Sequence, residues 1–153
     1  MRILDSTCGG RQLWENKDRE DTVYVDQRIM PKGSIPCRPN WNITPDIVAT
    51  FTNLPFADHS FDLVVWDPPH IIRKNVAKSN SIMRMKYAEL KTADWKETLT
   101  KGFNECYRVL KSPGTLHFKW SECDAPLKEV LLLFPIRPLF KNKEYTSWSV
   151  FVK

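Results

Sequence analysis

The chain contains 153 residues with a mass of 17.9 kDa, which is enough for one domain with a hydrophobic core and too little for two. Hydrophobic residues make up 42% and charged residues 27% of it, with a mean hydropathy of −0.42, which excludes intrinsically disordered and collagen-like chains. The net charge of +5 lies entirely in residues 71–92, where six basic residues accompany one acid, because the acids and bases of the remaining chain cancel.

The apolar runs are short and alternate with turns, which predicts strands joined by loops and helices. In chain order we expect strands at residues 3–4, 22–25, 46–49, 61–66, 115–120, 138–140 and 148–152, with a proline-rich loop at 31–45. No apolar run could span a bilayer, and the first residues lack the long apolar stretch of a signal peptide. We therefore expect an intracellular protein without membrane contact.

Two helices are predicted in the second half of the chain. Asp94 and Glu97 have the spacing of a capping box, and apolar side chains then recur at helical spacing up to Leu110. The run 112–114 (Ser-Pro-Gly) is expected to stop this helix, and a shorter apolar helix is expected at 126–134. We expect an α/β fold with one Rossmann-like, doubly wound, mostly parallel sheet over residues 1–153, closed by an antiparallel pair of strands.

The cysteines and histidines do not form a metal-binding pattern. The four cysteines lack a CxxC spacing, so in an intracellular chain we expect free thiols. The three histidines are too scattered to supply the close ligand pairs that zinc needs, and we expect no metal site.

The most specific feature of the sequence is Asp67-Pro68-Pro69-His70, which follows a strongly apolar strand. Neither proline can extend the strand, because neither has an N–H group. They fix a rigid turn that displays the Asp67 carboxylate beside a backbone carbonyl, and two such acceptors suit a ligand amine with two N–H donors. A plain turn after a strand is the alternative, but the position after a buried strand and before an aromatic ring favours a site.

Asp-Pro-Pro followed by an aromatic residue resembles the catalytic motif of class I amino-methyltransferases, which use S-adenosylmethionine to methylate exocyclic amines of adenine or cytosine. The order of the other motifs fits, since residues 4–10 look like the glycine-containing first motif and residues 106–114 like the helix end that precedes the next strand. The similarity covers nearly the whole chain and looks closest to small phage- and prophage-type DNA methyltransferases. The resemblance implies that Asp67 and the Pro68 carbonyl accept the hydrogens of the target amine, and that His70 stacks on a base that has left the duplex.

The resemblance also implies a cofactor site at the ends of the first three strands. Its expected residues are Asp5, Thr7, Cys8, Gly9, Gly10, Asp26, Thr50 and Phe51. Asp5 would orient the cofactor's ammonium group, the glycines would allow close approach of the backbone, and Asp26 would accept the ribose hydroxyls. Three positions depart from the family pattern: His70 replaces a commoner aromatic residue, Thr50 stands where many relatives have an acid, and the first motif has adjacent glycines.

The basic segment, residues 71–92, follows the Asp-Pro-Pro turn directly. We expect Arg73, Lys74, Lys78, Arg84 and Lys86 to bind nucleic-acid phosphates, with Trp120 lining the pocket of the base. The alternatives are a solvated loop for the charges and core burial for the tryptophan.

Together these features predict a methyltransferase that acts on an exocyclic amine of a nucleobase, with adenine in DNA favoured. Cytosine, an RNA base, and a catalytically silent nucleic-acid-binding subunit are the alternatives. The resemblance implies a bacterial or phage-infected cytoplasm. A chain that starts on its first strand has no room for a target-recognition domain, so a homodimer or a specificity subunit is an expected partner.

Overall fold

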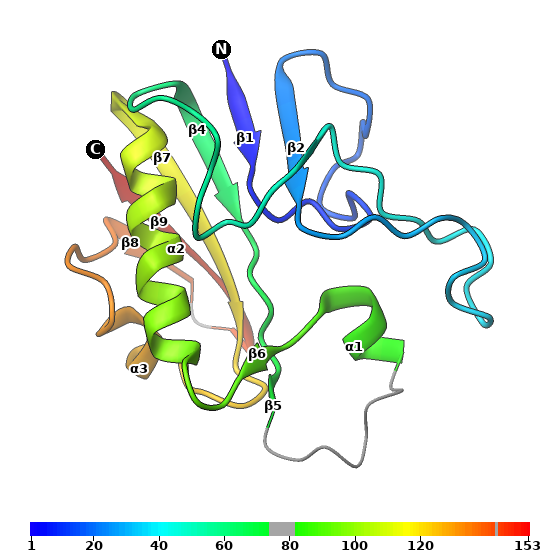
Figure 1. Ribbon diagram of the computed structural model, residues 1–153. Helices are drawn as coiled ribbons and strands as arrows, with labels where there is room; N and C mark the ends of the chain where they lie inside the picture. Colours follow the sequence, from blue (N-terminus) through cyan, green and yellow to red (C-terminus); the bar gives the residue numbers. More distant parts are fainter. Residues whose placement is uncertain (74–81, 143) are drawn as a thin grey trace.

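Seven strands, drawn from the beginning, middle and end of the chain, form one twisted sheet (Figure 1). The computed structural model describes residues 1–73, 82–142 and 144–153. Along the sheet the order is β3 (Ile47–Val48), β2 (Thr22–Asp26), β1 (Ile3–Asp5), β4 (Phe61–Trp66), β7 (Leu110–Ser121), β9 (Thr146–Val152) and β8 (Phe140–Lys141). The strands from β3 to β7 run parallel, and β9 is antiparallel to both β7 and β8. The expected α/β fold with an antiparallel end is confirmed.

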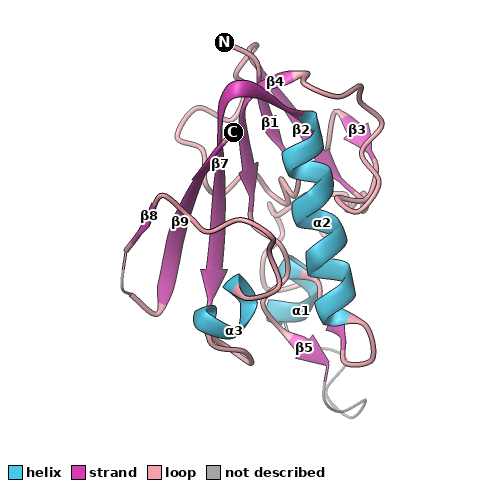
Figure 2. Cartoon of the chain, turned by 90° about the vertical axis from the view of Figure 1, so that its left-hand side faces the viewer, coloured by secondary structure: helices cyan, strands magenta, loops and turns pink. Residues whose placement is uncertain are grey.

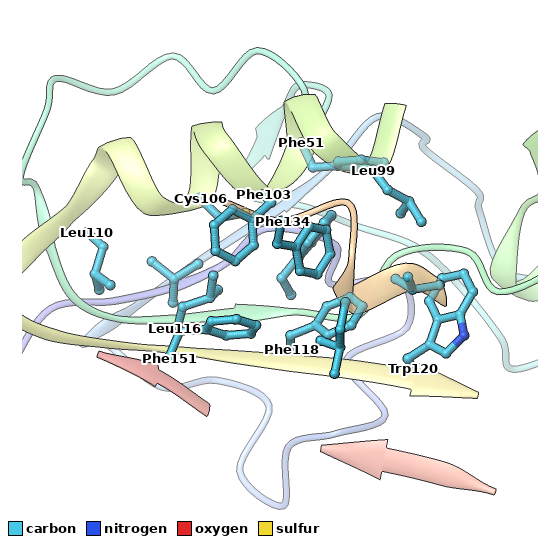
Figure 3. Close-up of a cluster of buried hydrophobic side chains, with 14 of the residues drawn as sticks. Phe51, Leu99, Phe103, Cys106, Leu110, Leu116, Phe118, Trp120, Phe134 and Phe151 are labelled. Carbon is cyan, nitrogen blue, oxygen red and sulfur yellow. The ribbon is translucent and has the colours of Figure 1, made fainter. Parts of the chain in front are cut away.

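The core lies between the sheet and two helices, α2 (Trp95–Val109) and α3 (Leu127–Leu131). Figure 2 shows α2 lying along one face of the sheet. Leu116 and Phe118 of β7 belong to the same buried cluster as Phe103 of α2, and the ring of Phe134 stacks on that of Phe103 at a centroid distance of 4.4 Å (Figure 3). Burial of these apolar faces is the main force that holds α2 against the sheet.

Two details of the predicted helix at 94–110 are wrong. The Asp94 side chain makes no capping hydrogen bond, and the Glu97 carboxylate instead pairs with Lys101 one turn further on, at 2.7 Å. The helix ends at Val109, and Leu110 already has extended dihedrals and begins β7. The Ser-Pro-Gly run therefore lies inside a long strand and does not stop the helix, because pairing of Leu110 with Phe61 of β4 draws the chain into the sheet.

The basic segment contains three short elements, β5 (Ile72–Arg73), α1 (Ile82–Tyr87) and β6 (Leu90–Lys91). β5 and β6 pair with each other in parallel, outside the main sheet. Figure 1 shows that these elements lie beyond the carboxyl ends of β1, β2, β4 and β7. Within the described part of the chain, no helix is long and apolar enough to cross a membrane.

Candidate active site

The candidate site is built by two loops at the carboxyl ends of β1 and β4, where the order of the strands reverses direction. The glycine loop, residues 5–10, follows β1, and the Asp-Pro-Pro loop, residues 67–70, follows β4. Ser6 donates its backbone N–H to the Val65 carbonyl at 3.0 Å, and the Thr7 hydroxyl accepts the Asp67 N–H at 2.8 Å. These bonds fix the two predicted motifs against each other.

The Asp67 carboxylate lies between two basic side chains. The Lys119 ammonium donates to its Oδ2 at 2.8 Å, and His70 Nε2 lies 2.9 Å from its Oδ1. All three side chains are largely buried, with 19% of Lys119, 14% of Asp67 and 13% of His70 exposed. Burial by itself would raise the pKa of Asp67, but its contacts with His70 and Lys119 outweigh that cost and hold the pKa below its usual value. Asp67 is therefore an ionised acceptor.

A cleft opens between the glycine loop, the Asp-Pro-Pro loop and the end of α1. Six of the predicted cofactor residues line it: Thr7, Cys8, Gly9, Gly10, Asp26 and Phe51. The lining also includes Asp67 and Pro69 of the Asp-Pro-Pro loop, Lys86 of the basic segment, and Ser6, Arg28, Trp41 and Lys119. Gly9 has a φ of +49°, a left-handed conformation that glycine adopts without strain. A Cβ on Gly10 would lie 2.8 Å from the Trp41 ring, so this position also requires glycine.

Asp26, the residue expected to bind a ribose, already has four donors. Its carboxylate accepts the Gly9 N–H at 3.0 Å and three N–H groups of Arg28, one from the backbone and two from the guanidinium, at 2.9 to 3.2 Å. The same guanidinium donates to the Met85 and Lys86 carbonyls at the end of α1, at 3.3 Å each. Asp26 lines the cleft as a ribose-binding acid would. A ribose hydroxyl could donate to its carboxylate once Arg28 gives up its hydrogen bond to one of the two carboxylate oxygens.

A second, adjoining cleft lies beside the first. It shares Gln27, Phe51 and Pro69 with the first cleft and adds Thr50 and the first turn of α2 to its lining. The Thr50 hydroxyl is hydrogen-bonded to the hydroxyl of Thr52 at 3.0 Å. Phe51 therefore forms part of the boundary between the two clefts, which is where a flat ring could pack against it.

Gly102 of α2 holds Phe51 in this position. A Cβ on Gly102 would lie 2.5 Å from the Phe51 ring and 2.7 Å from Trp66. We expect Gly102→Ala to push Phe51 toward the clefts, since overpacking of this kind costs about 1–3 kcal/mol. If the clefts hold the cofactor that the sequence predicts, S-adenosylmethionine should then bind about tenfold more weakly. Calorimetry measures this, with Asn104→Ala on the exposed face of the same helix as the control. Equal affinity of the two variants would show that Phe51 does not shape the site.

Asp5, a predicted cofactor residue, is not among the described residues that line the cleft. Its carboxylate is 1% exposed and accepts the Thr7 N–H at 3.2 Å and the Trp14 indole N–H at 2.7 Å. Burial raises the pKa of Asp5 to about 7. In this arrangement Asp5 holds the glycine loop by its hydrogen bonds to Thr7 and Trp14. A contact of Asp5 with the cofactor's ammonium group stays a prediction.

The raised pKa of Asp5 predicts a pH dependence of stability. The folded state binds a proton that the unfolded state releases near pH 4, so stability should fall by up to about 1.4 kcal/mol per pH unit from about pH 4 to pH 7 and level off above. Denaturant unfolding of Asp5→Asn should lack this fall, whereas Asp18→Asn, at a side chain that is 97% exposed, should retain it. The same slope in both variants would contradict this assignment.

Of the residues predicted to contact nucleic acid, the structure describes the side chains of Arg84, Lys86 and Trp120, and these three differ in their surroundings. Lys86 lines the first cleft, with its ammonium 4.3 Å from the centroid of the Trp41 ring, and Arg84 pairs with Glu89 at 3.2 Å. Lys74, Lys78 and the side chain of Arg73 lie outside the described residues. Trp120 is fully buried and donates to the Ala125 carbonyl at 2.9 Å, and its ring is nearly perpendicular to that of His70 at a centroid distance of 5.1 Å.

No group of three or more histidine, cysteine or acidic side chains in the described residues could hold a metal ion. The thiols of Cys8 and Cys106 are buried and unpaired, and burial raises the pKa of both above the usual value. Neither is therefore a ready thiolate at neutral pH.

Among solved structures, the PH0226 protein from Pyrococcus horikoshii OT3 matches 99% of this chain and 81% of its own, with a TM-score of 0.61 and 17% identity. The cyclase SpnF matches over 92% of this chain and 52% of its own, with a TM-score of 0.49 and 13% identity. The order of the seven strands, with its antiparallel end, is that of the class I methyltransferase-like α/β fold. At 17% identity the likeness to the PH0226 protein shows the fold alone. No family model matches the chain, and no curated protein does so at a significant level.

Sequence reasoning missed two residues of the candidate site, Arg28 and Trp41, and the contact of Lys119 with Asp67. Arg28 follows Asp26 by two residues, a spacing that could have suggested the ion pair. Trp41 comes from the proline-rich loop, which gives no signal of its position. The Lys119 contact depends on the pairing of β4 with β7, where Trp66 lies opposite Phe118 and the next residues are therefore neighbours.

Proposed function

We propose that this protein transfers a methyl group from S-adenosylmethionine to an exocyclic amine of a nucleobase, with adenine in DNA as the favoured target. The observation that carries the proposal is the Asp67 carboxylate, ionised and held at the edge of a cleft between the two loops. Pro68, the next residue, is buried and is not among the residues that line either cleft, and no described group donates to its carbonyl. Our proposal makes this carbonyl the second acceptor. These two acceptors match the two N–H groups of an amine.

The residues of the two clefts fit the cofactor by the chemistry of their donors and acceptors. Asp26 would accept the ribose hydroxyls, the glycine loop would receive the amino-acid part, and Phe51 would pack on the adenine. S-adenosylmethionine supplies an electrophilic methyl group when it is bound. The protein's task is then to orient the amine and to keep its lone pair directed at that methyl group, which Asp67 does by accepting N–H hydrogens.

The basic segment supports a nucleic acid as the larger substrate, because Lys86 and Tyr87 of α1 line the first cleft and the segment holds all of the chain's excess positive charge. A dimer or a separate specificity subunit would supply the sequence preference. The competing proposal, a silent nucleic-acid-binding subunit, predicts no cofactor binding.

Calorimetry with S-adenosylmethionine separates the two proposals. We expect one binding site per chain in the wild type and at least about tenfold weaker binding in Asp26→Ala, because a ribose then loses a charged acceptor. Asp21→Ala, directly before the first residue of β2 and so at the opposite end of that strand from Asp26, is the control for loss of an acid. A folded wild-type sample that does not bind the cofactor would refute the proposed function.

A further inference from the structure

The contact of Lys119 with Asp67 places a donor and an acceptor side by side in the first cleft. Lys119 Nζ and Asp67 Oδ2 are 2.8 Å apart, and both side chains line the cleft. Neighbouring positions on the parallel strands β4 and β7 bring them together, since Trp66 pairs with Phe118. The cleft therefore offers a hydrogen-bonding pattern, beyond the single acceptor that the sequence predicts.

Neither partner is saturated by the other. An ammonium group has three N–H donors, and Lys119 uses one of them within the described residues. Oδ1 of Asp67 is buried beside His70 Nε2, whereas Oδ2, which accepts from Lys119, has a second acceptor position for a ligand. The pair can bind a ligand that presents an N–H donor next to an acceptor.

The exposure of this pair differs from that of a second Lys–Asp pair on the same two strands. Lys111 of β7 donates to Asp62 of β4, also at 2.8 Å, but 40% and 34% of these side chains are exposed. Lys119 and Asp67 are 19% and 14% exposed. Hydrogen bonds from a ligand to the buried pair meet less competition from water, so they discriminate more strongly.

We propose that Lys119 is a specificity-determining residue that reads the ring nitrogen next to the target amine, while Asp67 accepts an N–H of the amine itself. An N–H group beside an unprotonated ring nitrogen occurs on the Watson–Crick edge of adenine and of cytosine. The inference rests on the proposed function and adds to it a selection for amidine-type amines. It excludes aliphatic amines, such as a lysine side chain, which have no neighbouring acceptor.

The test compares DNA oligonucleotides that carry adenine or 1-deazaadenine, in which a C–H group replaces the ring nitrogen, in the wild type and in Lys119→Met. In the wild type, kcat/KM should be about ten- to a hundredfold lower for 1-deazaadenine, the range for a hydrogen bond to a charged donor. In Lys119→Met the two substrates should be methylated at similar rates. The altered reactivity of the analogue's amine is the same for both proteins and cancels from this comparison.

Two further variants serve as controls. Lys119→Gln keeps an N–H donor and should keep part of the discrimination, whereas Lys111→Met removes the exposed pair and should keep all of it. S-adenosylmethionine binding verifies that each variant is folded. An equal ratio of the two rates in the wild type and in Lys119→Met would overturn the inference but leave the proposed function intact. If the wild type prefers cytosine, the same comparison uses 3-deazacytosine. Absence of methylation of either base would overturn both.

Discussion

Replacing Asp67 by Asn should lower methyl transfer at least about a hundredfold while S-adenosylmethionine still binds. The amide keeps the shape of the side chain, but it replaces one acceptor oxygen by an N–H donor. That donor would point at Lys119 or at His70, which lie 2.8 and 2.9 Å from the carboxylate oxygens, or at the target amine. In each case the variant loses the charged acceptor that orients the amine. Transfer of radiolabelled methyl groups to DNA measures the rate.

The control for Asp67→Asn is Asp62→Asn, within β4, the strand that Asp67 follows. Asp62 also pairs with a lysine of β7, and it lies at the opposite end of β4 from the site. We expect its methyl transfer to stay within about twofold of the wild type after correction for stability. A similar loss of rate in both variants would mean that the Lys–Asp pairs act on folding rather than on the reaction.

Replacing Phe103 by Ala should destabilise the fold by about 3–5 kcal/mol, a large part of the about 5–15 kcal/mol of a typical domain. Phe103 is fully buried, stacks on Phe134 and meets Phe151 edge-on at 5.0 Å (Figure 3). Its removal leaves a cavity between α2 and the sheet. Urea unfolding measures the free energy, and Phe140→Ala, at a ring that is 62% exposed, should change it by less than about 0.5 kcal/mol. A small effect at both positions would contradict this account of the core.

Much of the fold is legible in the sequence because its strands are buried and β-branched. The run 61–66 gives β4 with the predicted bounds, and the proline pair ends it where neither residue can donate to the sheet. The end of α2 was misjudged because a turn signal in the sequence, Ser-Pro-Gly, was outweighed by the pairing of Leu110 with Phe61. The turn propensity of a short run has little influence where a neighbouring strand can pair with its backbone N–H and C=O groups.

The candidate site was only partly predictable for a related reason. The glycine loop, Asp26 and Asp67 follow strands, and position after a strand can be read from the sequence. The partners of these residues cannot, because they depend on strand register and on the path of long loops. Lys119 of β7 meets Asp67 at the end of the neighbouring strand β4, and Lys86 of α1 lines the first cleft. The basic charges of residues 71–92 predicted a surface for phosphates, but they did not predict that Lys86 lines the first cleft.

The most direct test of the central claim is mass spectrometry of nucleosides from the DNA of cells that express the protein. A methylated exocyclic amine on adenine should accumulate in cells with the wild type and be absent from cells with Asp67→Asn at equal protein level. The same methylation in both, or unmodified bases in cells that contain folded, cofactor-binding wild-type protein, would contradict the assignment of Asp67 as the acceptor of a nucleobase amine.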